Sequence, residues 1–151
     1  MAACPSDPSA IVVQQVAVNR ILELRHAVLR ADLPKESARF DGDEAPGTIH
    51  VAACQGDLVV GCATYVRQGF EGEDAYRLRG MATAPQWQRH GLGHRLLTHA
   101  EELLRNDPIR LRWCNAREPA IGFYLKEGWT VVSELFDIPT AGPHRRMIRR
   151  C

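Results

Sequence analysis

The chain has 151 residues, a formal net charge of +1 and 45% hydrophobic residues. This length suits one domain with a buried core, whereas the near-zero charge argues against a nucleic-acid binder that works through a basic field. No apolar run approaches the ~20 residues of a membrane span, so we expect neither nucleic acid nor membrane as a partner.

The N-terminus and the cysteines bear on domain organisation and location. Residues 1–10 lack the basic and apolar stretches of a signal peptide. We expect them to form a short flexible lead before a single domain at 11–151. The five cysteines are odd in number and lack C-x-x-C spacing, which argues against a disulfide framework or a zinc site and fits the cytoplasm. Cys54 and Cys62 flank a predicted hairpin turn and could face each other, although ordinary strand positions are the simpler interpretation.

The first half of the chain predicts helices followed by a hairpin. Apolar residues at helical spacing indicate the first helix, and Gln-Gly-Asp between two apolar runs indicates a hairpin turn. The expected elements are a strand at Ile11–Val13, a helix at Asn19–Arg30, a short helix from Pro34, a loop at Asp41–Gly47, and strands at Thr48–Cys54 and Leu58–Val66.

The second half predicts a crossover between strands. The expected elements are a strand at Ala75–Thr83, a helix at Gly91–Arg105, a strand at Arg110–Cys114, a helix at Pro119–Glu127, and an antiparallel pair at Trp129–Phe136 and Arg145–Arg149. Antiparallel strands followed by a strand-helix-strand crossover predict an α/β fold with a mixed, mostly antiparallel twisted sheet and helices on its faces.

The segment Gln88-Arg89-His90-Gly91-Leu92-Gly93 joins the predicted strand at Ala75–Thr83 to the best predicted helix. Backbone N–H groups at a helix start lack intrahelical partners, and the helix dipole adds positive potential there. Gly91 and Gly93 have no Cβ, so an anion can approach the backbone closely. Arg89 and Arg95 flank the turn and can add charge-assisted hydrogen bonds. We therefore predict a phosphate-binding turn, the alternative being glycines required only for packing.

The spacing of this turn distinguishes it from the common nucleotide loops. The chain has no G-x-x-x-x-G-K-[ST] and no G-x-G-x-x-G after an N-terminal strand. Its Q-x-x-G-x-G spacing instead resembles the pyrophosphate-binding signature of the GCN5-related N-acetyltransferase (GNAT) family, which holds acetyl-coenzyme A. The run from Asn115 to Trp129 resembles the same family's N-x-x-x-x-A-x-x-F-Y-x-K-x-G-[FW] signature.

Further segments resemble the ElaA-like branch of that family. They are Leu24-Arg25 with Val28-Leu29, the Phe40–Glu44 loop, and the closing Gly142–Met147. The resemblance covers nearly the whole chain from about Val18. It implies the family's fold and transfer of an acetyl group from acetyl-CoA to an amine of a small molecule or peptide. A non-catalytic acyl-CoA-binding or sensor module of the same fold is the alternative.

The resemblance also assigns the donor site. The pyrophosphate would be held by Arg89, His90, Gly91, Leu92, Gly93 and His94, after the signature residue Gln88. In the family the preceding strand splays away from its neighbour, so the backbone of Met81, Ala82 and Thr83 would bind the pantetheine arm. The Met81 N–H would then act as the oxyanion donor; simple packing of the Met81 side chain is compatible with this role.

Two residues of the second signature carry expected roles near the thioester. Tyr124 occupies the position of the family's general acid, and a phenol stays protonated at pH 7 to supply a thiolate with a proton. The alternative for Tyr124 is a half-buried helix aromatic. Asn115 would contact the cofactor arm or orient the acid, or else cap the helix that starts near Pro119.

The general base is less evident from the sequence. Many relatives carry a Glu on the strand before the loop, whereas this strand has only Glu73 and Asp74 near its start. His144 is the expected substitute because imidazole titrates near neutrality, with His50 or a water relay as alternatives. The remaining histidines resemble no metal site, so no metal is expected.

Two charged clusters lie outside the motifs, one acidic and one basic. Asp41, Asp43 and Glu44 could attract a cationic amine, but a solvated acidic turn is the preferred interpretation. The C-terminal arginines are interpreted as a solvated strand and tail, namely Arg145, Arg146, Arg149 and Arg150. A homodimer is possible because sheet edges in this fold often pair.

Overall fold

The computed structural model describes residues 10–151, and it groups the chain into two compact units. The first unit contains residues 10–66 and 80–106, and the second contains residues 67–79 and 107–151. The predicted lead at residues 1–10 lies outside the described residues except for Ala10. The single domain at 11–151 stays a prediction.

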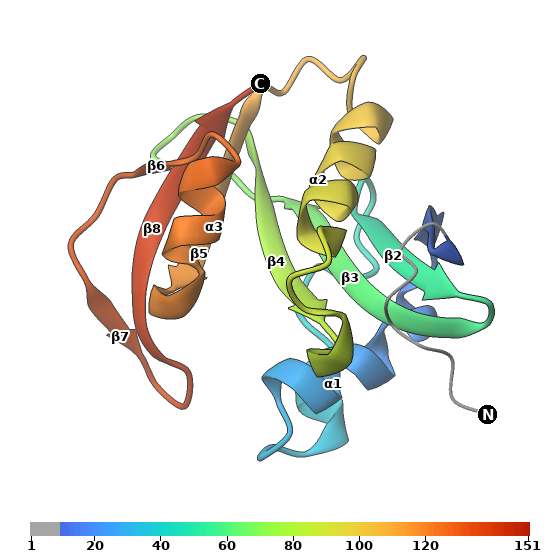
Figure 1. Ribbon diagram of the computed structural model, residues 1–151. Coiled ribbons are helices and arrows are strands. Elements are labelled where there is room, and N and C mark those ends of the chain that lie inside the picture. Colours follow the sequence, from blue (N-terminus) through green and yellow to red (C-terminus); the bar gives the residue numbers. More distant parts are fainter. Residues whose placement is uncertain (1–9) are drawn as a thin grey trace. The chain divides into compact units, whose positions relative to one another are not determined.

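Antiparallel strands form the sheet of the first unit (Figure 1). Strand β1 pairs with β2, and β2 pairs with β3 across the predicted hairpin turn. Beyond β3 follows β4, whose residues 80–83 belong to this unit. The bounds are Val12–Val16 for β1, Ile49–Gln55 for β2, Leu58–Arg67 for β3 and Ala75–Thr83 for β4.

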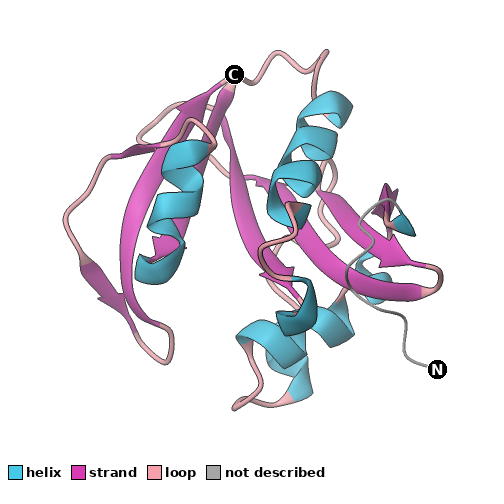
Figure 2. Cartoon of the chain, in the orientation of Figure 1, coloured by secondary structure: helices cyan, strands magenta, loops and turns pink. Residues whose placement is uncertain are grey.

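Two helices and three 3-10 turns complete the first unit, and the last of these turns is at Pro85–Trp87 (Figure 2). The predicted helix at Asn19–Arg30 is split into a 3-10 turn at Val18–Arg20 and α1 at Leu22–Leu29. Val18 and Ile21 are both buried, a three-residue spacing that a 3-10 turn satisfies. The short helix expected from Pro34 is a 3-10 turn at Lys35–Ala38.

Helix α2, at Leu92–Leu103, packs against β1 and β2 through an apolar stripe. The stripe consists of the buried residues Leu92, Leu96, Leu97 and Ala100. Gly91 precedes the helix in a left-handed conformation, so the helix starts one residue later than predicted. This packing fixes the direction of the helix start and of the turn that leads into it.

The second unit combines one parallel and several antiparallel strand pairs. The start of β4 pairs in parallel with β5, and β8 pairs antiparallel with β5, β6 and β7. The bounds are Leu111–Arg117 for β5, Thr130–Val131 for β6, Phe136–Ile138 for β7 and Gly142–Arg150 for β8. Helix α3, at Ile121–Lys126, lies on β5 after a 3-10 turn at Glu118–Ala120. The prediction of a mixed, mostly antiparallel α/β fold is confirmed.

The predicted continuous strand at Trp129–Phe136 is wrong. The structure has two short strands, β6 and β7, joined by a loop (Figure 2). The Ser133 hydroxyl accepts the backbone N–H of Arg146 at 2.7 Å, so a side chain occupies a hydrogen bond that a strand ladder would use. This local competition interrupts the edge strand.

The described cysteines, in residues 10–151, form no disulfide. Cys54 and Cys62 are buried free thiols that are not paired in register, since Cys54 lies opposite Val59 and Cys62 opposite Ala52. None of the helices in this range is long and apolar enough to cross a bilayer.

Candidate active site

The predicted phosphate-binding turn lies at the start of α2 in the first unit. Arg89 has φ +64° and Gly91 has φ +78°, so the chain reverses sharply before the helix. No side chain of the described residues caps the helix start. The backbone N–H groups of this first turn therefore remain a suitable surface for an anion.

Gly91 leaves open space where a side chain would stand. A Cβ built on Gly91 meets no heavy atom within 4 Å among the described residues. Its left-handed φ already favours glycine, and the empty space adds room for a ligand against the backbone. Gly91 thus meets both requirements of the predicted turn.

Side chains of the loop mainly stabilise the loop itself. Gln88 Nε2 donates to the Thr83 carbonyl at 3.2 Å, which ties the loop to the end of β4. His90 Nδ1 donates to the Gln88 carbonyl at 2.9 Å, and its ring packs edge-on against Trp87. Gln88 and His90 therefore shape the turn, whereas Arg89 is exposed at its apex.

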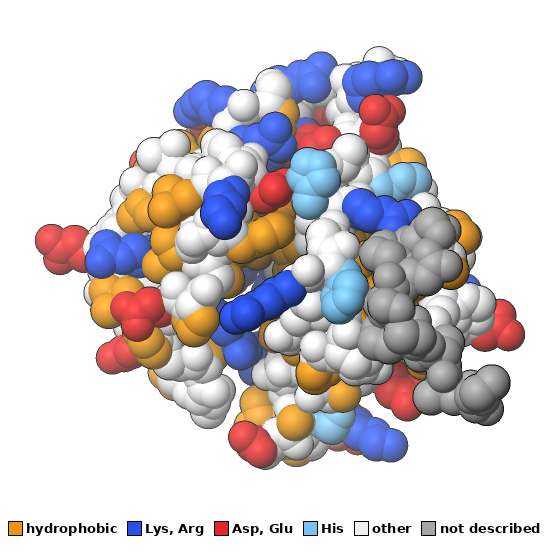
Figure 3. All heavy atoms as spheres, viewed as in Figure 1, with side chains coloured by type: hydrophobic (Ala, Val, Ile, Leu, Met, Phe, Trp, Pro, Cys, Tyr) orange, Lys and Arg blue, Asp and Glu red, His pale blue; other side chains and the backbone are white. Residues whose placement is uncertain are grey.

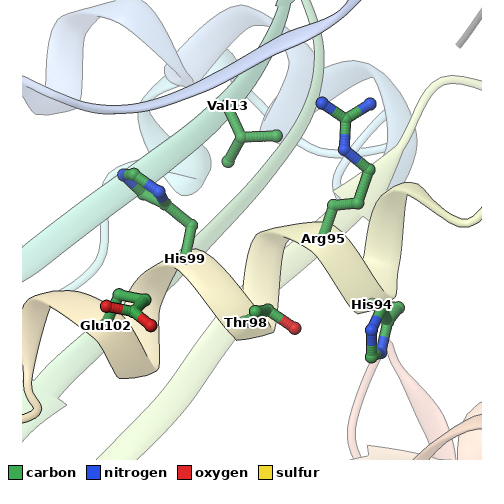
Figure 4. A pocket seen from close by; sticks show the side chains of 6 residues that line it. All are labelled: Val13, His94, Arg95, Thr98, His99 and Glu102. Carbon is green, nitrogen blue, oxygen red and sulfur yellow. The ribbon is translucent and has the colours of Figure 1, made fainter. Parts of the chain in front are cut away.

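Arg95 forms a hydrogen bond to the residue before β1. It donates from Nη2 to the Ile11 carbonyl at 2.8 Å. Figure 4 shows Arg95 and His99 projecting from α2 toward Val13, while His94 points to the other side of the helix. These residues help to line a hollow of about 380 Å³. A role of Arg95 at the turn stays a prediction.

The end of β4 carries Met81, Ala82 and Thr83, the residues expected along the pantetheine arm. The parallel ladder between β4 and β5 covers three pairs and ends at Arg77 opposite Trp113. Strand β4 continues to Thr83 beyond that ladder. Gly80 interrupts the extended backbone with φ +60°, directly before Met81.

A buried arginine explains why residue 80 must be glycine. A Cβ on Gly80 would lie 2.7 Å from Arg25 Nε and 3.1 Å from the Phe40 ring. Arg25 is fully buried, and its guanidinium stacks on Phe40 at 4.1 Å from the ring centroid. The arginine therefore packs directly against the bend in β4 that precedes Met81.

Asp43 pairs with this arginine and is part of the fold. Arg25 donates to both carboxylate oxygens of Asp43 at 2.7 and 3.2 Å, and to Thr64 Oγ1 at 2.8 Å. His50 bonds to Thr64 Oγ1 and to the Asp43 carbonyl, each at 2.8 Å. Asp43 is therefore not a solvated acidic residue, and His50 is engaged as a structural link rather than as a base.

Tyr124 lies on α3 in the second unit and is buried. Its ring makes edge contacts with Phe123 and Trp129 at centroid distances of 5.2 and 5.5 Å. Burial, and then the nearby Cys114 thiol, raise the pKa of Tyr124 above its ordinary value of 10.0. The phenol accordingly keeps its proton at neutral pH, as a proton donor requires.

Asn115 and His144 lie on paired strands of the second unit. Asn115 Oδ1 accepts a hydrogen bond from Arg146 Nε at 3.2 Å, and no side chain caps the 3-10 turn that starts at Glu118. The capping interpretation of Asn115 is therefore wrong. His144 is buried, and its Nδ1–H donates to the Gly142 carbonyl at 2.7 Å. This tautomer leaves Nε2 as the proton acceptor.

The carboxylates near the start of β4 do not provide a base on the strand. Glu73 forms an ion pair with Arg150 at 2.7 Å, which lowers the Glu73 pKa, and Asp74 is exposed before the strand begins. Among residues 10–151, no group of three or more His, Cys, Asp or Glu side chains is arranged to hold a metal ion.

Sequence reasoning missed the arginines on the sheet of the second unit. Arg146 is half-buried beside Asn115 rather than part of a solvated tail, and Arg77 is half-buried against Trp113. Alternation along β8 places Arg146 and Arg145 on opposite faces. Only the register between strands reveals which arginines share a face, so the sequence offered no direct signal.

Comparisons with known proteins match this fold. Residues 18–129 match the model of the acetyltransferase (GNAT) family. The chain is 34% identical over 135 residues to "Uncharacterized N-acetyltransferase YitI" of Bacillus subtilis (strain 168), covering 87% of this chain and 91% of the relative.

Two solved structures resemble the chain over most of its length. Escherichia coli ElaA superposes with a TM-score of 0.77 at 18% identity, covering 93% of this chain and 99% of ElaA. An aminoglycoside 6'-N-acetyltransferase complexed with coenzyme A superposes with a TM-score of 0.74 at 16% identity, covering 92% and 96%. At such low sequence identities, these two similarities show a shared fold and nothing more.

Proposed function

The chain belongs to the acetyltransferase (GNAT) family, and we propose that it transfers the acetyl group of acetyl-CoA to a primary amine. The acceptor would be a small molecule or a peptide, and the amine would attack the thioester directly in a ternary complex. The observation that carries this proposal is the turn at Gln88–Gly93, with open space over Gly91 and an uncapped helix start.

The first unit would bind the donor mainly through its backbone. The N–H groups of Gly91, Leu92 and Gly93 at the start of α2 would receive the pyrophosphate, with Arg89 and His94 beside them. The backbone of Met81, Ala82 and Thr83 would receive the pantetheine arm. The relative solved with coenzyme A has the same fold, which supports this placement by analogy.

Two side chains would move the protons of the reaction. The thioester, when bound, supplies an activated acetyl group and a thiolate leaving group. Tyr124 would protonate that thiolate, since burial keeps its phenol protonated. His144 would accept the proton of the amine at Nε2, because Nδ1 is held by the Gly142 carbonyl. The Met81 N–H would stabilise the oxyanion.

A second candidate function is a non-catalytic acyl-CoA sensor of the same fold. It is favoured by one observation: β4 carries arginines where many relatives carry a carboxylate base. The buried free thiols Cys54 and Cys62 suit a reducing compartment, so we propose a cytoplasmic location for either function. A homodimer through a sheet edge also stays a proposal.

Turnover separates the two functions. The purified protein is incubated with acetyl-CoA and a panel of primary amines, and release of the CoA thiol is followed together with the mass of the acetylated product. We expect amine-dependent CoA release above the rate without protein. Acetyl-CoA binding without turnover of any amine would contradict the enzyme and favour the sensor.

A further inference from the structure

The strand register of the second unit gathers arginines on one face of its sheet. Arg77 on β4 lies opposite Trp113 on β5, and Asn115 on β5 lies opposite Arg146 on β8. Side chains of directly paired residues point to the same face, and residues two apart on a strand share that face. This face carries Arg77, Arg79, Trp113, Asn115, His144 and Arg146, called here the arginine face, and its margins carry Arg117, Ile148 and Arg150.

Helix α3 lies on the opposite face. Its Tyr124 acts electrostatically with Cys114, a neighbour of Trp113 and Asn115 that points the other way. A Cβ on Gly128, just after α3, would lie 3.5 Å from Arg149 Nε, and Arg149 alternates with Arg146 along β8. Hydrophobic side chains gather around α3 in Figure 3. The arginine face is therefore the one that α3 does not cover.

Aromatic rings hold two of the arginines in place. The Arg77 guanidinium carbon lies 4.8 Å from the centre of the Trp113 ring. The Arg146 guanidinium carbon lies 5.7 Å from Trp113 and 5.3 Å from Phe136, and its Nε donates to Asn115 Oδ1 at 3.2 Å. Arg77 Nη1 also donates to Gln68 Oε1 at 3.3 Å. Stacking fixes the planes of both guanidinium groups, and each group has more N–H donors than these hydrogen bonds use.

Two of these cations, Arg77 and Arg146, have no carboxylate partner among residues 10–151. Neither Arg77 nor Arg146 forms an ion pair with any Asp or Glu among residues 10–151, whereas Arg150 and Arg67 of the same unit do. Arg77 Nε is buried and has no hydrogen-bond partner in the described structure. Burial, and then the charges of Arg79 and Arg146, lower the pKa of Arg77 from 12.5 to about 10. Arg77 is still a cation at pH 7.

Like charges brought together at half-buried positions repel one another unless an anion joins them. We propose that the acceptor of the acetyl transfer is an amine that also carries an oxyanion group, a carboxylate or a phosphate. Arg77, Arg79 and Arg146 hold that group. This assignment rests on the proposed function, since it names the acceptor class for the same reaction.

The position of His144 fits an acceptor of this class. His144 and Arg146 are two residues apart on β8, which separates their Cα atoms by about 7 Å on the same face. An amine at His144 and an oxyanion at Arg146 would therefore belong to one short molecule. Amino acids and amino-alkyl phosphates are short molecules that carry both groups.

Matched pairs of amines test the acceptor class. An amino acid is compared with its amide, and phosphoethanolamine with ethanolamine, in the acetyl-CoA turnover assay. A hydrogen-bonded charge pair corresponds to at least about a tenfold effect, so we expect kcat/KM to be at least about tenfold higher for the anionic member of a pair. The pair with the larger ratio identifies carboxylate or phosphate.

Variants of the arginine face test where the oxyanion binds. We expect Arg146→Gln and Arg77→Gln each to reduce the preference for the anionic amine about tenfold, mainly through KM. Arg146→Lys should retain part of the preference because it keeps the charge. The matched control is Arg149→Gln, on the same strand but on the α3 face, which should retain the full preference. Circular dichroism establishes that each variant is folded.

Several outcomes would overturn the assignment. Equal turnover of anionic and neutral amines would reject the anionic acceptor while leaving the acetyltransferase intact. A preference that survives in both glutamine variants would place the anion elsewhere. Weaker acetyl-CoA binding by Arg146→Gln, measured by calorimetry, would assign the arginines to the donor. Turnover of neither member of any pair would contradict the proposed function itself, and the acceptor class with it.

Discussion

Arg25 in the first unit and Arg77 in the second are both sheltered from solvent, yet their surroundings differ. Arg25 meets the two oxygens of Asp43, the Ala38 carbonyl and the Thr64 hydroxyl. Arg77 meets an aromatic ring, the Gln68 side-chain oxygen and the charges of two further arginines. The first unit neutralises Arg25 with its own carboxylate, whereas no Asp or Glu among residues 10–151 forms an ion pair with Arg77.

This difference separates polar groups that stabilise the fold from polar groups that serve a ligand. A buried arginine with its own carboxylate needs nothing from outside, and its loss affects folding. Arginines without a carboxylate destabilise the unit in which they gather, so such a cluster points to binding of an anion. Substitutions that break the Arg25–Asp43 ion pair should therefore change stability, and those on the arginine face or at Tyr124 should change activity.

The largest effect is expected for Asp43→Ala. Removing the carboxylate leaves the Arg25 charge buried without its partner, which costs about 3–5 kcal/mol in the free energy of unfolding. Urea denaturation measures this loss. A change below about 1 kcal/mol would show that the ion pair does not stabilise the first unit.

Glu44→Ala is the matched control for this variant. Glu44 is adjacent in sequence and pairs with Arg39 at 3.5 Å, but its side chain is 75% exposed. An exposed ion pair contributes about 0–1 kcal/mol, so the control should unfold near the wild-type midpoint. Equal losses in both variants would mean that the loop, rather than the buried charge, determines stability.

Tyr124→Phe should lower activity rather than stability. The variant removes one hydroxyl in the second unit and keeps the ring contacts with Phe123 and Trp129. We expect kcat to fall about 100-fold through loss of the proton donor, while acetyl-CoA affinity stays nearly unchanged. Steady-state and pre-steady-state rates measure the effect. An unchanged kcat with chemistry as the slow step would exclude Tyr124 as the acid.

The pH profile gives a second test of the same residue. Burial raises the pKa of Tyr124 above 10.0, so the protonated, donating form persists as pH rises and is lost only above that raised pKa. We therefore expect no fall in kcat caused by Tyr124 below about pH 10. A descending limb near pH 8 that disappears in Tyr124→Phe would contradict the raised pKa.

The smallest effect on stability is expected for Arg146→Gln. The substitution removes one of the mutually repelling cations and keeps an amide that can still contact Asn115. We expect the free energy of unfolding to change by less than about 1 kcal/mol, in contrast to Asp43→Ala. A loss of about 3 kcal/mol would place Arg146 with the structural arginines.

The parts that the sequence predicted correctly depend on local chemistry. The bounds of β4, Ala75–Thr83, follow from its apolar pattern and from Pro85 after it. The turn before α2 was recognisable because a left-handed residue at Gly91 favours glycine whatever surrounds it. Features that depend on the backbone conformation of a few neighbouring residues can be recognised from the spacing of residue types in the sequence.

The parts that the sequence did not predict depend on distant partners. Asp43 was interpreted as a solvated acidic residue because its partner Arg25 lies 18 residues away. The break between β6 and β7 depends on a hydrogen bond from Arg146 to Ser133, 13 residues apart. The arginine face required the register of three strands, which no spacing within one segment contains.

Acetyl-CoA binding to two glycine variants tests the central claim most directly. Gly91→Val fills the open space at the predicted phosphate turn, and Gly56→Val is the matched control. Gly56 has φ +59° in the β2–β3 turn and is equally open, so both variants strain the backbone by about 1–2 kcal/mol.

In calorimetry we expect micromolar binding by the wild type and by Gly56→Val, and at least about a 100-fold weaker affinity for Gly91→Val. Wild-type affinity in a folded Gly91→Val protein, or no binding by the folded wild type, would contradict the assignment of this turn to acetyl-CoA.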